Sequence, residues 1–133
     1  MIVLDASAVS ELLLNTDGGR RVAARIADPA ESLHAPHLLS VEVAQVLRRY
    51  VAARAVPDEI AVAVLADLAA IDIARYPHEP FLPRVWELRA NVTVYEAVHL
   101  APAEVLDAPL LTFDQRLAAA PGHGAAVEVL AGR

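Results

Sequence analysis

The sequence predicts an α/β fold, a three-layer α/β/α sandwich in which helices cover both faces of a central parallel sheet. Short apolar runs of strand length alternate with helical patterns from one end of the chain to the other. The first run, Met1–Leu4, is apolar throughout, as expected of a strand buried on both faces. No repeat, linker or low-complexity tract interrupts the 133 residues, so we expect a single domain over residues 1–133.

The N-terminal half contains elements in the order that such a sheet requires. Met1–Leu4 is expected to form a strand that stops at Asp5, and residues 7–14 follow with helical spacing. The polar, glycine-containing segment 15–19 is expected to break that helix. The remaining elements expected here are a helix at 20–27, a strand at 32–35, a long amphipathic helix at 36–55 and a helix at 57–70.

The C-terminal half continues the alternation of strands and helices. The elements expected here are a strand at 71–74, helices at 81–90 and 93–106, a strand at 110–112, a helix at 114–120 and a strand at 127–130. Pro102 falls inside the second of these helices, where proline removes one backbone hydrogen bond at a cost of about 3 kcal/mol. We therefore expect a kink or break near Val98, one turn earlier.

The composition limits the cellular setting and the partners. The chain has 17 acidic and 11 basic residues, a net charge of −6, whereas strong nucleic-acid binders are usually basic. It contains no Cys, which favours a reducing cytoplasm. The N-terminus has no basic start, and no apolar run approaches the roughly 20 residues that span a bilayer. We expect a cytoplasmic protein without a membrane segment.

Two of the predicted strands are followed by an aspartate. Asp5 follows the first strand and Asp114 the strand at 110–112, and in open parallel sheets ligands bind beyond the carboxyl ends of the strands. Glu42 and Glu96, each early in a helix, can point to the same rim. Clustered carboxylates repel one another unless a cation is present, and hard oxygen ligands suit Mg²⁺ or Mn²⁺. Such ions clamp phosphate oxygens and activate water.

Each acid also has a purely structural interpretation. Asp5 or Ser7 could cap the first helix, and Asp114 could cap the helix that follows it. Glu42 could be a solvated helix residue near Arg49. The spacing alone therefore leaves a metal-dependent phosphoesterase and a set of helix caps as open alternatives.

Glu96 has the strongest structural alternative. The segment Thr93–Glu96 reads T-x-x-E, a capping box in which the glutamate bonds back to the Thr93 N–H. Glu96 and His99 also form a single E-x-x-H, whereas di-iron helix bundles need that motif twice. We therefore expect His99 to lie behind the site or at the surface.

Four segments resemble the motifs of PIN domains, specifically of VapC-type toxins, in the order and at the spacing of that family. They are MIVLDASA at 1–8, LLSVEVAQVLRR at 38–49, NVTVYEAVHLA at 91–101 and LLTFDQRLA at 110–118. The resemblance spans nearly the whole chain.

The resemblance implies a metal-dependent endoribonuclease toxin of a toxin–antitoxin pair. Its catalytic and metal-binding carboxylates would be Asp5, Glu42, Glu96 and Asp114 around Mg²⁺ or Mn²⁺, and Ser7 and Thr112 would support the pocket. It also implies an RNA substrate, a cognate antitoxin protein that occludes the pocket, and a toxin homodimer. We consider Arg48, Arg49, Arg54 and Arg116 as candidate phosphate contacts.

One departure from the family pattern concerns the third acid, which is usually Asp and is Glu96 here. The extra methylene places the carboxylate farther out, at a site where octahedral Mg²⁺ tolerates little displacement. We hypothesise that Glu96 still faces the metal but that activity is weaker or Mn²⁺ is preferred. The alternative function is a catalytically weak PIN domain that acts mainly by binding RNA or a protein.

Other phosphate chemistries fit poorly. The receiver and haloacid-dehalogenase-like folds also begin with a strand that ends in Asp, but they use a Lys and this chain has none. The glycine-rich loops G-x-G-x-x-G and G-x-x-x-x-G-K of nucleotide-binding folds are absent as well.

Overall fold

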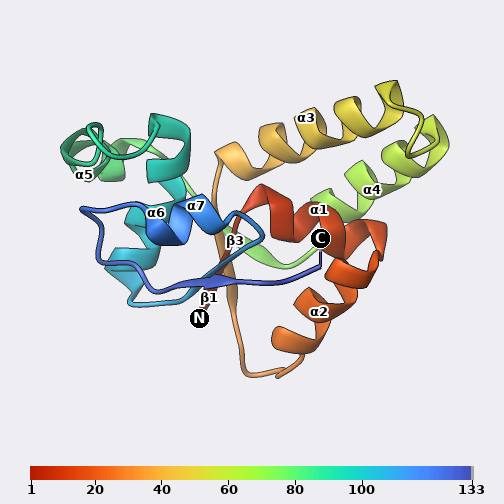
Figure 1. Ribbon diagram of the computed structural model, residues 1–133. Helices are drawn as coiled ribbons and strands as arrows, with labels where there is room; N and C mark the ends of the chain where they lie inside the picture. The colour runs from red at the N-terminus through yellow and green to blue at the C-terminus, as the bar shows by residue number, and fades with distance from the viewer. Residues whose placement is uncertain (133) are drawn as a thin grey trace.

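The computed structural model describes residues 1–132, which form a parallel sheet with helices on both faces (Figure 1). Within those residues the sheet has five strands in the order β3-β2-β1-β4-β5, all parallel. The strands are β1 (Ile2–Leu4), β2 (Leu33–Pro36), β3 (Ile73–Tyr76), β4 (Leu110–Thr112) and β5 (Val127–Val129). The predicted fold class is confirmed. The last residue of the expected domain, 133, lies outside the described part.

The helices divide into two layers (Figure 1). One layer contains α1 (Ala6–Leu14), α2 (Asp17–Arg25), α3 (Leu38–Ala52) and α4 (Asp58–Ala70). The other contains the short 3₁₀ helix η1 (Glu79–Phe81), α5 (Leu82–Glu87), α6 (Val94–Leu106) and α7 (Gln115–Ala119). None of the helices built by residues 1–132 combines the length and apolar character needed to cross a membrane.

Side-chain alternation along the strands produces one apolar core under each layer. Successive strand residues point to opposite faces. Ile2 and Leu4 therefore pack with α1 to α4, whereas Val3 packs with α5 to α7. In the neighbouring strand β4, Leu111 belongs to the first core and Leu110 to the second. All five side chains are fully buried, which explains the apolar runs in the sequence.

The prediction that segment 15–19 lies between helices is wrong at its C-terminal end. Only Asn15 and Thr16 separate the helices, because α2 begins at Asp17 with Thr16 accepting the Gly19 N–H at 3.0 Å. A Cβ on Gly19 would lie 1.9 Å from the backbone oxygen of Glu11. The glycine is needed for close approach of α2 to α1, and not for a turn.

Other details of the elements also differ from expectation. Strand β3 starts at Ile73, two residues late, because Ile71 forms the C-cap of α4. The expected helix at 81–90 is divided into η1 and the shorter α5. The break expected near Val98 does not occur: α6 runs without interruption and contains Pro102, which is buried.

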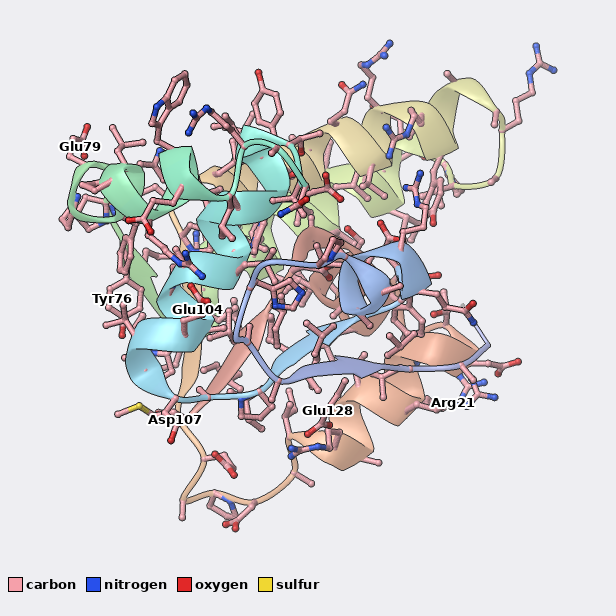
Figure 2. The ribbon with its side chains drawn as sticks, turned by 60° about the vertical axis from the view of Figure 1, so that its left-hand side comes forward. Arg21, Tyr76, Glu79, Glu104, Asp107 and Glu128 are labelled. Carbon is pink, nitrogen blue, oxygen red and sulfur yellow. The ribbon has the colours of Figure 1, made fainter. Side chains whose placement is uncertain are left out.

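Ion pairs attach the outer elements to this framework. Arg25 on α2 forms a two-pronged pair with Glu128 on β5, both distances being 2.8 Å. Arg84 on α5 does the same with Glu104 on α6 at 2.9 Å. Figure 2 shows Glu104 on the outer side of α6 and Glu128 between β5 and α2. The two pairs fix the edge of the sheet and the α5–α6 layer.

Candidate active site

The strand order places a crevice at the carboxyl ends of β1 and β4. From β1 the sheet extends to β2 on one side and to β4 on the other, so the chain reverses direction across this point. Such switch points are where open α/β sheets bind ligands. Leu4 pairs with Leu111, and the Asp5 N–H donates to the Leu111 carbonyl at 3.3 Å. The strands preceding Asp5 and Asp114 are therefore neighbours in the sheet.

A cleft of about 420 Å³ opens at this point and collects side chains from α1, α3, α6 and α7 and from the residues that follow β1 and β4. All four acids singled out in the sequence line it, together with Ser7. Its lining also includes Gln45, Arg49, Tyr95, His99 and Arg116. Thr112 is fully buried at the end of β4 and contacts the cleft through Asp5.

Asp5 serves both as a helix cap and as the floor of the cleft. It is the N-cap of α1, and its Oδ1 accepts from the Ala8 N–H at 3.0 Å and from Ser7 Oγ at 2.7 Å. Its Oδ2 accepts from Thr112 Oγ1 at 2.5 Å. Ser7 Oγ in turn accepts from the Phe113 N–H at 3.0 Å. The two hydroxyls thereby tie the Asp5 carboxylate to the end of β4.

Asp114 is held by its own short helix. It is the N-cap of α7 and accepts from the Arg116 N–H at 3.0 Å. The Arg116 guanidinium adds contacts at 3.2 and 3.3 Å to the two carboxylate oxygens. This hydrogen bonding raises the pKa of the Arg116 guanidinium above its usual value. The Arg116 side chain remains 89% exposed, so the pair is a surface feature of the cleft rim.

Glu42 and His99 form a contact that the sequence did not indicate. His99 Nε2 lies 2.5 Å from Glu42 Oε1, and this bond joins α6 to α3. His99 is 4% exposed and belongs to the buried wall of the cleft, so it is not a surface residue. The positions of Glu42 and His99 along their helices are compatible with a place near the crevice. That they contact each other depends on how α3 and α6 pack against the sheet, which the sequence does not specify.

The Glu96 carboxylate is engaged in a complete capping box. Thr93 N–H donates to Glu96 Oε1 at 2.8 Å, and Glu96 N–H donates to Thr93 Oγ1 at 3.1 Å. Glu96 still lines the cleft. The expected capping box is therefore confirmed, and Glu96 lies at the rim of the acidic cleft.

The oxygen atoms available in the cleft are of the type that binds hard divalent cations. Four carboxylates share one cleft, and such oxygen ligands are those that Mg²⁺ and Mn²⁺ prefer. Within residues 1–132, no three Asp, Glu or His side chains stand close enough together to form a ready coordination shell. Each carboxylate is instead turned toward a local donor. Binding of an ion would therefore require these side chains to move closer to one another.

The four candidate phosphate contacts separate into two groups. Arg49 and Arg116 line the cleft. Arg48 bonds Gln45 at 3.0 Å on the exposed side of α3, and Arg54 follows the end of that helix, so neither lines the cleft. Position along α3 decides this difference, because Arg49 lies two helical turns after Glu42 and shares its face.

A family model, two relatives and a solved structure to which this chain is similar all point to the same protein family. The PIN domain family model matches residues 2–122. Ribonuclease VapC12 of Mycobacterium tuberculosis is 40% identical over 98% of this chain and 100% of its own length. Ribonuclease VapC1 of the same species is 44% identical over 90% of each chain. The structure of VapBC2 from Rickettsia felis, bound to a promoter DNA fragment, superimposes with a TM-score of 0.68 at 11% identity, over 98% of this chain and 99% of that chain.

These likenesses agree with the cleft geometry. The family match covers β1, α3, α6 and β4, which together supply the four carboxylates. The relatives match almost from end to end, so the whole described fold is shared with them. The chain belongs to the PIN-domain family, among the VapC ribonucleases.

Proposed function

We propose that this protein is the endoribonuclease toxin of a toxin–antitoxin pair and hydrolyses RNA phosphodiester bonds with the help of a divalent metal. The observation that carries the proposal is the convergence of Asp5, Glu42, Glu96 and Asp114 on one cleft at the switch point of the sheet. The family of ribonucleases to which the chain belongs supports the same activity.

We propose Asp5 as the fixed anchor of the metal site. Three hydrogen bonds orient its two oxygens, so it loses little further freedom when an ion is bound. Ser7 and Thr112 act through Asp5 by supplying two of those bonds. Glu42, Glu96 and Asp114 complete the ligand set or hold a second ion. Bound Mg²⁺ or Mn²⁺ would supply an activated water and neutralise developing phosphate charge.

Two arginines lining the cleft are suited to hold the RNA backbone. Guanidinium groups form two-pronged hydrogen bonds to phosphate. Arg49 lines one part of the cleft from α3, and Arg116 lies beside Asp114 on α7. In a protein with a net charge of −6, these cations would give the polyanion a local point of attachment.

The proposed partners are a cognate antitoxin and a second copy of the chain. VapBC2 carries a paired name and was solved on promoter DNA, which supports a protein partner for the family. An apolar groove of about 400 Å³ between α3 and α4 offers contact surface and includes Leu47, Val51, Val62 and Leu65. We place this assembly in the cytoplasm and treat residues 1–133 as one domain.

A second candidate function is a catalytically weak PIN domain that binds RNA or protein. Two observations favour it: the Glu96 carboxylate is engaged by its own helix cap, and Arg116 neutralises Asp114. A cation would have to compete with Arg116 for Asp114 and share the Glu96 carboxylate with the Thr93 N–H. The two functions differ in turnover, because a binding module would retain RNA without cutting it.

The decisive experiment incubates the purified protein with total RNA plus Mg²⁺, Mn²⁺ or chelator. We expect cleavage that needs added metal, and an Asp5→Asn variant at least 100-fold slower because its anchor charge is lost. Asp67→Asn, on the exposed side of α4, makes the same chemical change outside the cleft and should behave as the parent does. Cleavage that survives chelation, or that Asp5→Asn leaves intact, contradicts the proposal. RNA retention without any turnover supports the binding module.

A further inference from the structure

We propose that His99 is a positioning residue of the metal site: its Nε2–H holds one oxygen of Glu42 and leaves the other oxygen for the cation. The proposal rests on the proposed function, since it assigns a role in the same cleft. The usual acidic motif does not include this residue, and the sequence alone places it only behind the site or at the surface.

The contact is short and mostly shielded from water. His99 Nε2 and Glu42 Oε1 are 2.5 Å apart, and the His99 side chain is 5% exposed whereas that of Glu42 is 30% exposed. The donor therefore sits in the packed layer and the acceptor faces the cleft. A hydrogen bond to a carboxylate is about twice as strong as one between neutral groups, and more so where water is excluded.

The position of the proton follows from the acceptor. An ionised carboxylate has only lone pairs, so the hydrogen must lie on His99 Nε2. His99 Nδ1 is buried and, within residues 1–132, has no hydrogen-bond partner. A bare ring nitrogen is better tolerated there than an unpaired N–H. The geometry therefore favours one tautomer, with Nε2 as the donor.

The orientation of the Glu42 carboxylate depends more on one hydrogen bond than that of the Asp5 carboxylate does. Its carboxylate lies at the end of a longer side chain, so fixing it costs more rotamer freedom. Asp5 is oriented by Ser7, Ala8 and Thr112. Among the described residues, His99 is the only hydrogen-bond donor to Glu42, and no bond reaches Oε2. That oxygen is available to an ion while Oε1 stays in place.

The rigidity of His99 comes from its helix. Its neighbours Val98 and Leu100 are 5% and 0% exposed and belong to the core between α6 and the sheet. The imidazole is therefore carried by the packed part of α6. Hydrogen bonds to ligating carboxylates of this kind typically alter metal affinity by about 10- to 100-fold when removed.

Two amide substitutions separate the role of the donor from that of the ring. In His99→Gln, the amide nitrogen is as many bonds from Cβ as Nε2 is, so it can donate to Glu42. In His99→Asn, the amide nitrogen corresponds to Nδ1 and is too short to reach. Both variants introduce a neutral polar amide into the same buried position. A difference between them therefore reports the hydrogen bond to Glu42.

The experiment measures Mn²⁺ binding to the full chain by electron paramagnetic resonance of the free ion, beside RNA cleavage. We expect His99→Asn to bind Mn²⁺ about tenfold more weakly than the parent, and His99→Gln to remain within about threefold. In a Glu42→Gln background, His99→Asn should change the affinity less than twofold, because the group it positions is gone. His37→Asn, at an exposed histidine outside the cleft, serves as the control.

The outcomes separate this proposal from the proposed function. If the parent binds Mn²⁺ and Asp5→Asn does not, but His99→Asn matches the parent, only the role of His99 is overturned. Equal losses in the Asn and Gln variants likewise overturn it, because the donor would not matter. If the parent binds no Mn²⁺, both proposals fall. Circular dichroism of each variant verifies that the helix content is retained. If the Asn variant unfolds, a loss of Mn²⁺ affinity well beyond threefold in the folded Gln variant still overturns the proposal.

Discussion

At the scale of single residues, the acids of the cleft combine local and tertiary roles. Asp5 and Asp114 cap α1 and α7, and Glu96 closes a capping box, so each is explained by its own helix. The same three side chains line one cleft. Helix N-termini stabilise negative charge, and the carboxyl ends of parallel strands bring those N-termini together. The structural and functional interpretations are therefore compatible rather than exclusive.

Replacing Glu96 by Asp tests the balance between cap and metal. The shorter side chain reaches the Thr93 N–H poorly, so we expect a loss of about 0.5–1 kcal/mol in the free energy of unfolding. It also frees a carboxylate at the position of the usual acid, so Mg²⁺-supported cleavage should rise about tenfold, and the Mn²⁺ advantage should shrink. Urea unfolding and initial rates with each metal measure the two effects.

The control for that variant is Glu59→Asp, an exposed residue in the first turn of α4 and outside the cleft. It should alter neither rate nor metal preference. If Glu96→Asp is no more active than the parent with either metal, Glu96 does not limit the site, and the hypothesis of a weakened third ligand is wrong.

At the scale of elements, α6 does most to organise the site. It carries Glu96 at its first turn, His99 one turn later, and Glu104 near its end. Glu104 accepts two bonds from Arg84 at 2.9 Å and one from the Gly124 N–H at 2.7 Å. It therefore joins α6 to α5 and to the segment before β5. The hydrogen bonds from Arg84 hold the pKa of Glu104 below its usual value of 4.5.

The pH dependence of stability follows from this ion pair. A carboxyl group whose pKa is lowered by folding contributes its full stabilisation at a pH above its pKa in the unfolded chain, which is near 4.5 for Glu104. That stabilisation is lost as the pH falls from there toward the lower pKa of the folded protein. Glu104→Gln should lower the free energy of unfolding at pH 7 by about 1–2 kcal/mol, since both partners are partly exposed. It should also flatten the decline below pH 4.5. Urea unfolding from pH 7 to pH 3 measures both.

Glu87→Gln is the matched control, because Glu87 contacts the same Arg84 at 3.3 Å from a 65% exposed position. Its effect should stay within about 0.5 kcal/mol. If the two variants have the same profile with pH, the Arg84–Glu104 pair does not carry the acid sensitivity of this layer.

At the scale of the whole molecule, the net charge of −6 must be reconciled with an RNA substrate. Two arginines line the cleft, so RNA binding should release about two counterions and weaken about sevenfold between 50 and 200 mM NaCl. Fluorescence anisotropy with single-stranded RNA and the slow Asp5→Asn variant measures this dependence. The double variant Arg49→Gln, Arg116→Gln should nearly abolish it, whereas Arg48→Gln should not. A much steeper dependence would require phosphate contacts outside the cleft.

The exposed apolar side chains predict association of the chain with itself. Val62 and Leu65 on α4 are 60% and 41% exposed, and they border the groove between α3 and α4. Surfaces of this kind commonly serve as interfaces. We expect sedimentation velocity at micromolar concentration to give twice the 14.2 kDa mass of one chain. A species that stays monomeric at 100 µM contradicts the proposed homodimer.

Much of this molecule could be predicted because its information is local. Continuous apolar runs mark the buried strands, helical spacing marks the helices, and an aspartate after β1 and near the end of β4 marks the crevice. Gly19 shows the limit of such reasoning. The glycines and polar residues of segment 15–19 suggest a turn, but Gly19 lies within α2, where the absence of a side chain allows close approach to the Glu11 backbone. Pro102 likewise leaves α6 unbroken once it is packed in the core.

The fold class, the strand-end acids and the capping box could be predicted from the amino-acid sequence, because each depends on residues a few positions apart. The position of β1 between β2 and β4, the sharing of one cleft by four carboxylates and the hydrogen bond between His99 and Glu42 became known only from the folded structure. Those facts join residues far apart in the sequence, 57 positions for Glu42 and His99 and 107 for Asp5 and Thr112. They depend on the packing of each helix against the sheet, which periodicity along one segment does not specify.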